Sequence, residues 1–261
     1  MLIPRFIMQI TVSSNWIIKD PAFIQALHDN FGNTFETSDV TELRLSGYGI
    51  NNLEGLAFFP NLVTLICDHN LLQRLDVSKN LKLQYLDCME NDLTELNVSN
   101  NLFLKTLECG GNKITDLDLK KNINLQSLRC WNAVETYSID DFVYHRIIRQ
   151  AGLKTLDLSK NEQLCLLDCA GNHLETLDLS HNNQLCSIDC RYNLLTSLDV
   201  RNTNLPNYEQ KLGDHFYPLK CSNMPSLKTL YIKREWTLKG INNPRLPECI
   251  DSQTNVISCF K

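Results

Sequence analysis

A spacing of 21 residues between cysteines constrains this 261-residue chain more than any other feature of its sequence. Five segments of that length, beginning at residues 62, 83, 104, 164 and 185, share the pattern L-x-x-L-x-C-x-x-N-x-L-x-x-L-D-L-S-x-N-x-x. A repeat of this kind is typical of a solenoid, in which each coil buries its apolar face only against its neighbours. The cysteines that keep the interval form two runs: Cys67, Cys88, Cys109 and Cys130, then Cys169 and Cys190.

The positions within the repeat have distinct physical roles. The L-x-x-L-x-C half predicts a short strand with Leu and Cys pointing inward, and coils about 4.8 Å apart would join these strands into a parallel sheet. The L-x-x-L-D-L half lines the opposite wall of the same core. We interpret the inward cysteines as a column of reduced, buried thiols. Two asparagine columns are predicted to bond to turn backbone: Asn70, Asn91, Asn112, Asn172 and Asn193, then Asn80, Asn101, Asn122, Asn161 and Asn182.

These repeats resemble the bacterial leucine-rich repeat family with a 21-residue unit, over residues 40 to about 239. The segment from Asp20 to Phe23 before a short helix, and the later Leu53 and Leu56, resemble the amino-terminal cap of internalin-like members. The resemblance implies an α/β fold: a right-handed leucine-rich repeat solenoid with a parallel β-sheet, about eight coils, a helical N-terminal cap and an irregular C-terminal cap. It also implies a binding scaffold without catalytic activity of its own.

We expect one leucine-rich repeat domain over residues 1–261, because the coils of a solenoid do not fold as independent units. Residues 1–39 would form the N-terminal cap, with Asp20 capping a helix that has Pro21 in its first position. The repeats would span residues 40–234, with a degenerate coil at 206–226, and residues 235–261 would form the C-terminal cap.

An insertion at residues 134–152 interrupts the repeats, because the second half of the coil resumes at Leu153 rather than at position 135. The segment from Ser138 to Asp141 offers a helix start and Gly152 a stop. We predict a short amphipathic helix that protrudes from the solenoid; an insertion that folds back to patch the core stays open as the alternative. One face of the predicted helix would carry Ile139, Phe142, Val143, Arg146 and Ile147.

Two further cysteines, Cys165 and Cys186, lie four residues before the inward cysteines of adjacent coils. A zinc site made from such a pair of C-x-x-x-C units is disfavoured, because residues four apart on a strand are about 13 Å apart. Cys165 and Cys186 should instead stack across one strand spacing, so a disulfide between them stays open in an oxidising compartment. We expect no metal and no other cofactor.

A column of aspartates near the end of each repeat could suggest a calcium ladder. The glycine-rich nonapeptide of calcium-binding β-rolls is missing, and each Asp has a turn two residues later to bond, so we favour a structural role. The six histidines occupy unrelated positions, and no G-x-S-x-G, Walker or H-E-x-x-H motif occurs. The sequence therefore predicts no enzyme. The column consists of Asp76, Asp118, Asp157, Asp178 and Asp199.

Overall charge and hydropathy exclude further classes of function. With 25 basic and 30 acidic residues the net charge is −5, so we expect no nucleic-acid partner. No apolar stretch reaches the roughly 20 residues that cross a bilayer. The opening MLIPRFIMQI makes a poor signal peptide, which leaves the cytosol open beside the secreted or cell-surface location that the resemblance implies.

The outward strand positions predict the binding surface. Large side chains lie among acids and arginines there, a composition enriched at protein interfaces. We expect a protein or peptide partner on the sheet face; the alternative is a carbohydrate-binding surface adhesin, with the aromatic rings as stacking platforms. The outward series closes with Thr229 and Tyr231. The candidate site residues are Tyr85, Asp87, Met89, Glu108, Arg129, Trp131, Asp168, Asp189, Arg191 and Tyr192.

Overall fold

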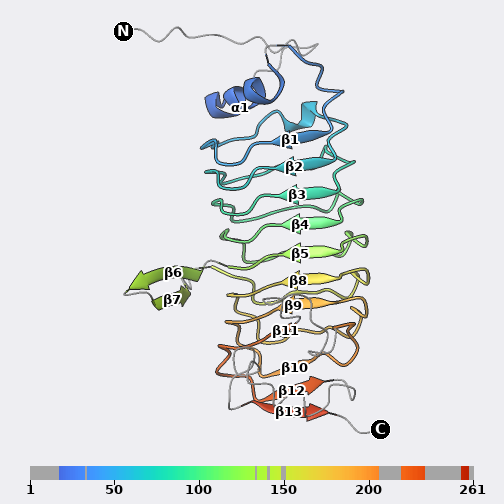
Figure 1. Cartoon of the computed structure of the whole chain (residues 1–261). Coiled ribbons are helices and arrows are strands. Elements are labelled where there is room, and N and C mark those ends of the chain that lie inside the picture. The colour runs from blue at the N-terminus through green and yellow to red at the C-terminus, as the bar shows by residue number, and fades with distance from the viewer. Residues whose placement is uncertain are drawn as a thin grey trace.

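The computed structural model describes residues 18–32, 34–132, 134–139, 142–147, 151–205, 219–232 and 254–258. Its coils stack in single file, so that short strands run side by side along one wall (Figure 1). This wall is an eight-stranded parallel sheet in the order β1, β2, β3, β4, β5, β8, β9, β11. The strands are β1 (Glu42–Arg44), β2 (Thr64–Ile66), β3 (Tyr85–Asp87), β4 (Thr106–Glu108), β5 (Ser127–Arg129), β8 (Leu166–Asp168), β9 (Ser187–Asp189) and β11 (Leu219–Lys220).

The strand register confirms the repeat. Thr64 pairs with Tyr85, and Tyr85 pairs with Thr106, each step being one repeat of 21 residues. Ser127 of β5 pairs directly with Leu166 of β8, so the insertion leaves the sheet unbroken. The structure therefore has the predicted leucine-rich repeat solenoid with its parallel sheet.

The inward cysteines lie in the core as predicted. All six are buried and form no disulfide, and Cys221 in the last coil of the sheet is buried as well. Burial raises the pKa of the Cys109 thiol to about 12, and it raises the pKa of Cys88 and Cys169 well above the ordinary value of a thiol. These thiols are therefore protonated at neutral pH and act as small apolar side chains.

The helix α1 (Pro21–Phe31) covers the first coil. Asp20 caps it by accepting hydrogen bonds from the backbone N–H groups of Ala22 and Phe23, as the sequence predicts. Phe23 and Leu27 on its inner face are fully buried in the core. A short 3-10 helix, η1 (Leu56–Phe58), follows β1. No helix among the described residues is both long enough and apolar enough to cross a membrane.

The two asparagine columns bond to turn backbone, as predicted. In the first column, the Asn112 amide donates to the carbonyl of Cys88 in the preceding coil, and its oxygen accepts from the N–H of Leu93. In the second column, Asn101 donates to the carbonyls of Val77 and Asn80. The side-chain oxygens of the second column are buried without a hydrogen-bond partner among the described residues. The two columns thus differ in how much of the turn backbone depends on them.

The aspartate column also supports turns. Asp76 accepts a hydrogen bond from the N–H of Ser78 at 2.9 Å, and Asp118, Asp157, Asp178 and Asp199 make the same contact two residues along the chain.

The predicted helix in the insertion is wrong. Residues 134–152 contain an antiparallel hairpin, β6 (Val134–Ile139) and β7 (Phe142–Ile147), that projects from the solenoid in Figure 1. The register runs from Val134 paired with Ile147 to Ile139 paired with Phe142, and residues 140–141 lie outside the described part. The segment VETYSI–DD–FVYHRI is rich in β-branched and aromatic residues, and that preference prevailed over the helical spacing.

We expected Thr229 and Tyr231 at outward positions of the main sheet, and this prediction is also wrong. They belong to β12 (Thr229–Ile232), which pairs with β10 (Ser197–Asp199) on the second wall, not with the main sheet. The strand of this coil in the main sheet is β11, whose Lys220 pairs with Asp189. A further strand, β13 (Asn255–Ser258), pairs in parallel with β12 inside the tail that we expected to be irregular. The rest of that tail, residues 1–17 and residues 206–218 lie outside the described part.

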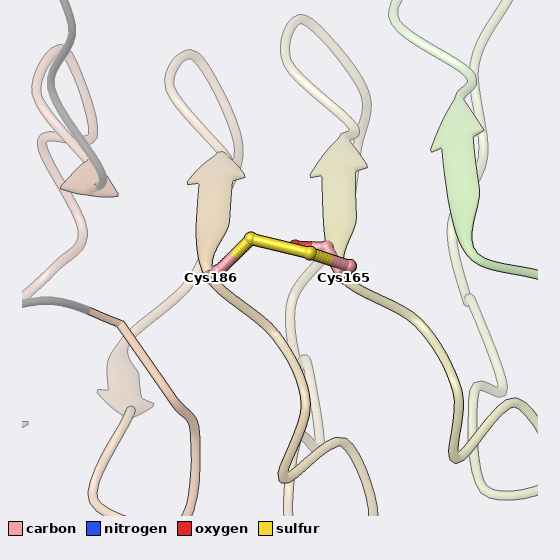
Figure 2. The surroundings of a disulfide bond; sticks show 2 residues. All are labelled: Cys165 and Cys186. Carbon is pink, nitrogen blue, oxygen red and sulfur yellow. A yellow bond between two sulfur atoms is a disulfide. The ribbon is translucent and has the colours of Figure 1, made fainter. Parts of the chain in front are cut away.

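Cys165 and Cys186 form a disulfide between adjacent coils (Figure 2). They lie just before β8 and β9, and their Cα atoms are 5.1 Å apart. The alternative that the sequence left open is therefore the one observed, and the bond links two coils that the repeat already stacks.

Candidate binding surface

The last residue of each sheet strand from β3 to β11 is charged and points outward. The register places these residues side by side across the sheet, and we name them the charged row: Asp87, Glu108, Arg129, Asp168, Asp189 and Lys220. The row has two acids, one base, two acids and one base in that order, so Arg129 has a carboxylate on both neighbouring strands.

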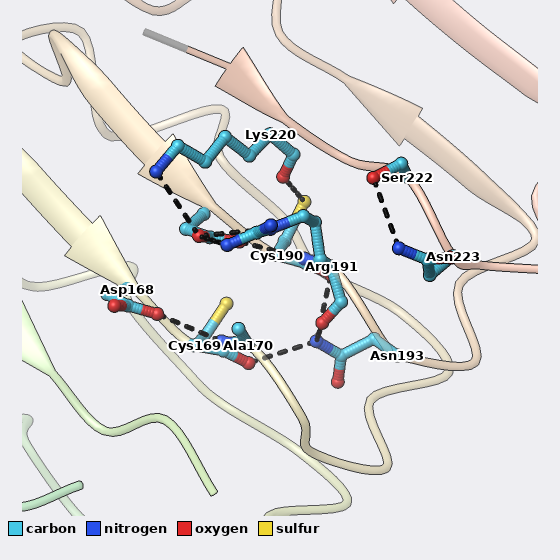
Figure 3. A network of polar contacts seen from close by, with 10 residues as sticks. Asp168, Cys169, Ala170, Cys190, Arg191, Asn193, Lys220, Ser222 and Asn223 are labelled. Carbon is cyan, nitrogen blue, oxygen red and sulfur yellow. Dashed lines mark hydrogen bonds and ion pairs between the residues drawn. The ribbon is translucent and has the colours of Figure 1, made fainter. Parts of the chain in front are cut away.

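Two parts of the charged row are paired internally. Arg129 Nη1 lies 3.3 Å from Glu108 Oε1. The side chain of Arg191 donates to both carboxylate oxygens of Asp189, Nε to Oδ1 at 2.9 Å and Nη2 to Oδ2 at 2.7 Å. Asp189 Oδ2 also lies 3.9 Å from Nζ of Lys220, which is labelled with Arg191 in Figure 3. Asp189 is therefore neutralised by this chain itself, and Arg191 is oriented along the face.

The other two carboxylates of the charged row have no ion-pair partner among the described residues. Burial raises the pKa of Asp87 to about 6, and the nearby carboxylates of Asp68 and Glu108 raise it as well. Burial also raises the pKa of Asp168 to about 6, and the carboxylate of Asp189 raises it as well, whereas the charges of Arg129 and Lys220 lower it. A positive charge placed beside either group would stabilise its ionised form.

Backbone bonds hold these carboxylates in place. Asp87 accepts a hydrogen bond from the N–H of Met89 at 3.1 Å, and Asp168 accepts one from the N–H of Ala170 at 3.2 Å. Each bond lowers the pKa of its carboxyl, but burial outweighs it. The acids that we predicted for binding are therefore also turn supports, as in the aspartate column of the second wall.

The large side chains that we predicted to be exposed are only half-exposed. Tyr85, Met89, Trp131 and Tyr192 all pack partly against the sheet. Trp131 lies directly over Gly110, where an added Cβ would come within 2.5 Å of the indole Nε1. The guanidinium of Arg191 lies 6.0 Å from the centre of the Tyr192 ring.

These residues form a strip rather than a pocket. Tyr85 on β3 and Tyr192 after β9 are four strand spacings apart, about 19 Å, with Arg129 near the middle. The structure thus places all ten candidate residues on one face but does not gather them at one point. Lys220 completes the charged row, but it was not predicted as a site residue because the register over 206–226 was misplaced. The available signal was the sequence L-K-C, in which Leu219 and Cys221 match the inward positions of the repeat.

Within the described residues, no group of three or more His, Cys, Asp or Glu side chains is arranged to hold a metal ion. The side chains that the face does present, the charged row with the rings of Tyr85, Trp131 and Tyr192, offer charge pairing and aromatic contact. Both suit the recognition of another molecule.

Comparison with solved structures supports the fold. Internalin C2 from Listeria monocytogenes is 17% identical and matches 92% of this chain and 93% of its own, with a TM-score of 0.55. The functional domain of InlJ from the same organism, described as including a cysteine ladder, is 22% identical, with a TM-score of 0.37. The match covers 92% of this chain and 59% of the InlJ domain.

A leucine-rich repeat protein from Leptospira interrogans is 16% identical over 68% of this chain and 44% of its own, with a TM-score of 0.47. Neither a protein-family model nor a curated protein matches the sequence. The likeness to internalin C2 is one of fold, with parallel strands on one wall of a solenoid.

Proposed function

The chain has the fold of an internalin-like leucine-rich repeat solenoid, and from that premise we propose that it is a non-catalytic scaffold whose sheet face binds a protein or peptide. Solenoids offer extended rigid faces of this kind for recognition. The partner would present basic side chains to Asp87 and Asp168 and an acidic or aromatic group to Arg129 and Tyr85.

The observation that carries the proposal is that two carboxylates of the charged row, Asp87 two strands from Arg129 and Asp168 on the strand beside it, have no ion-pair partner among the described residues. Asp87 is 7% exposed, and its pKa near 6 means that the fold keeps a costly negative charge there at neutral pH. A cation from a partner would offset that cost, and a partly desolvated pair contributes more than one in water. Asp189, which this chain neutralises itself, shows how such a pair is made.

A peptide display library panned against the protein tests this proposal. We expect the selected peptides to be enriched in Lys and Arg, and the double variant Asp87→Asn/Asp168→Asn to bind them about tenfold or more weakly at pH 8. Asn retains the oxygen that accepts the turn hydrogen bond, so the variant keeps the local fold. The matched control Asp116→Asn/Glu175→Gln removes the same two charges from exposed positions off the sheet face and should bind as the wild type does.

Peptides that bind the double variant and the wild type equally would contradict the proposal. So would a glycan array on which the protein binds a sugar through Trp131 while no peptide is selected, which would favour the carbohydrate-binding alternative instead.

We further propose that the protein works in an oxidising compartment, at the cell surface or beyond it. The disulfide between Cys165 and Cys186 supports this, because such bonds persist outside the cytosol. Mass spectrometry of alkylated protein from its native source should find the two peptides linked; finding both thiols reduced and alkylated would contradict this location.

A further inference from the structure

Three consecutive turns on one edge of the solenoid expose large apolar side chains. The turns precede β3, β4 and β5 and comprise residues 78–82, 99–103 and 120–124. Leu81 is 54% exposed, Leu102 49%, Phe103 58% and Ile123 55%. We name these four residues the turn patch. Isolated exposed apolar residues are common in proteins, whereas a contiguous group marks an interaction site.

The turn patch is contiguous because its members are in register. Leu81, Leu102 and Ile123 occupy the same position of successive repeats, so they follow one another at about the 4.8 Å spacing of the coils. Side-chain bonds tie each turn to the one before it: Asn100 Nδ2 donates to the carbonyl of Ser78 at 3.2 Å, and Asn124 Nδ2 to that of Leu102 at 2.9 Å. The patch is therefore a rigid surface rather than a set of loose loops.

The fold does not require apolar residues there. In the next two coils the same position carries Glu162 and Asn183, both exposed, in turns of the same form. The buried asparagine of each turn, such as Asn101, makes the same bonds in both kinds of coil. The apolar residues of the turn patch thus contribute to something other than the turn.

Lysines surround the turn patch, and the acids nearest to its turns in sequence are Asp76 and Asp118, which cap the first and third of them. The segments 77–86, 98–107 and 119–128 contain no Asp or Glu, although the whole chain has a net charge of −5. The five lysines in these segments are exposed. Lys120 lies 3.8 Å from Asp157, and Lys82 Nζ donates to Asn61 Oδ1 at 2.6 Å, so both reach along the edge from coil to coil. The lysines are Lys79, Lys82, Lys105, Lys120 and Lys121.

We propose that the turn patch docks on the surface of an anionic lipid bilayer. Half-exposed Leu, Ile and Phe side chains suit the boundary between headgroups and acyl chains, and lysines around them suit lipid phosphates. A second copy of the chain fits this surface poorly, because a symmetric dimer through the same patch would bring lysines against lysines. The sheet face is a separate surface, so docking through the turns leaves the charged row free.

Flotation with lipid vesicles tests the proposal. We expect the protein to float with vesicles of phosphatidylcholine containing about one third phosphatidylglycerol, to bind pure phosphatidylcholine far more weakly, and to dissociate in high salt, which screens the lysines. The variant Leu102→Asn/Phe103→Gln copies the turn of Asn183 and Gln184, so it keeps the fold; it should lower the partition coefficient about tenfold or more.

Charge variants complete the test. Lys79 and Lys121 occupy the repeat position that carries Asn100 in the coil between them, so Lys79→Asn/Lys121→Asn introduces a residue that this turn already accepts. The variant should lower the partition coefficient about fivefold for each lysine. The matched control Lys154→Asn/Lys228→Asn removes two exposed lysines elsewhere on the solenoid and should change it by no more than about twofold.

Absence of binding to the anionic vesicles would overturn the proposal. Binding that both patch variants retain would overturn it too, because the contact would then lie elsewhere. Analytical ultracentrifugation supplies a further outcome. If the protein does not bind vesicles but forms a dimer, and Leu102→Asn/Phe103→Gln separates that dimer, the turn patch would be assigned to a second copy of the chain. Capture by an acidic protein in place of vesicles would assign it to that protein.

Discussion

Replacing one asparagine from each column should cost very different amounts of stability, although both side chains are buried and both donate hydrogen bonds to turn backbone. Asn112→Ala removes the acceptor of the Leu93 N–H, which is 3.0 Å from Asn112 Oδ1. It also removes the amide that donates to the carbonyl of Cys109 at 3.0 Å. An orphaned buried donor costs about 1–3 kcal/mol and a lost bond to the carbonyl adds about 1, so we expect a loss of about 3 kcal/mol.

Asn101→Ala leaves the backbone of its turn satisfied. The carbonyl of Val77 still accepts from the N–H of Asn80 at 3.0 Å, and the carbonyl of Asn80 still accepts from the N–H of Leu83 at 3.1 Å. The substitution also removes a buried oxygen that accepts no hydrogen bond from any described residue. We therefore expect a loss of only about 1 kcal/mol, from two bonds to carbonyls that keep another donor.

Urea unfolding at equilibrium measures the difference. The midpoint of Asn112→Ala should fall well below that of Asn101→Ala at an unchanged slope, which corresponds to about 2 kcal/mol between the two variants. Asn100→Ala, which removes an exposed amide at a turn, is the control and should change stability by less than about 0.5 kcal/mol. Equal losses for the two buried positions, or a larger loss for Asn101, would refute the reasoning from hydrogen-bond counts.

Three other perturbations have expected outcomes. Asp87 has a pKa near 6 in the folded state and an ordinary one in the unfolded state, so the folded state binds more protons between pH 4 and 6. The stability of the wild type should therefore fall as the pH rises through that window. In urea titrations Asp87→Asn should be more stable than the wild type by about 1–2 kcal/mol at pH 8 and should lose that advantage by pH 4. Cys165→Ser/Cys186→Ser opens a loop closed over 21 residues and should cost about 3 kcal/mol, whereas an unchanged urea midpoint would contradict this. Gly110→Ala would place a Cβ 2.5 Å from the Trp131 indole, so Trp131 fluorescence should shift to longer wavelength; an unaltered spectrum would show that the ring does not lie there.

The repeat made most of the fold predictable, because one inward cysteine every 21 residues fixes the register of every coil that keeps it. The same logic placed Cys165 opposite Cys186 but could not decide their oxidation, which depends on the solvent and not on the register. Prediction failed where the repeat is interrupted. Between β5 and β8 a helical spacing competed with β-branched and aromatic residues, and local preference formed a hairpin.

The candidate surface was predictable in outline but not in exposure. The register put Asp87, Arg129 and Asp168 on one face, as the structure has them. It could not show that Trp131 lies over Gly110, because that contact depends on a missing side chain in the neighbouring coil. Nor did it show the turn patch, which becomes a surface only when three turns are stacked and their exposure is known.

The titration of the Asp87 and Asp168 carboxyls by NMR tests most directly whether the sheet face is built to receive a partner's cation. With carbon-13-labelled aspartate, the free protein should show both groups titrating near pH 6. Addition of a lysine-rich peptide selected by the wild type should move both pKa values down by about one unit or more, since a bound cation favours the ionised form. Ordinary aspartate titration in the free protein, or values that the bound peptide leaves unmoved, would contradict the account.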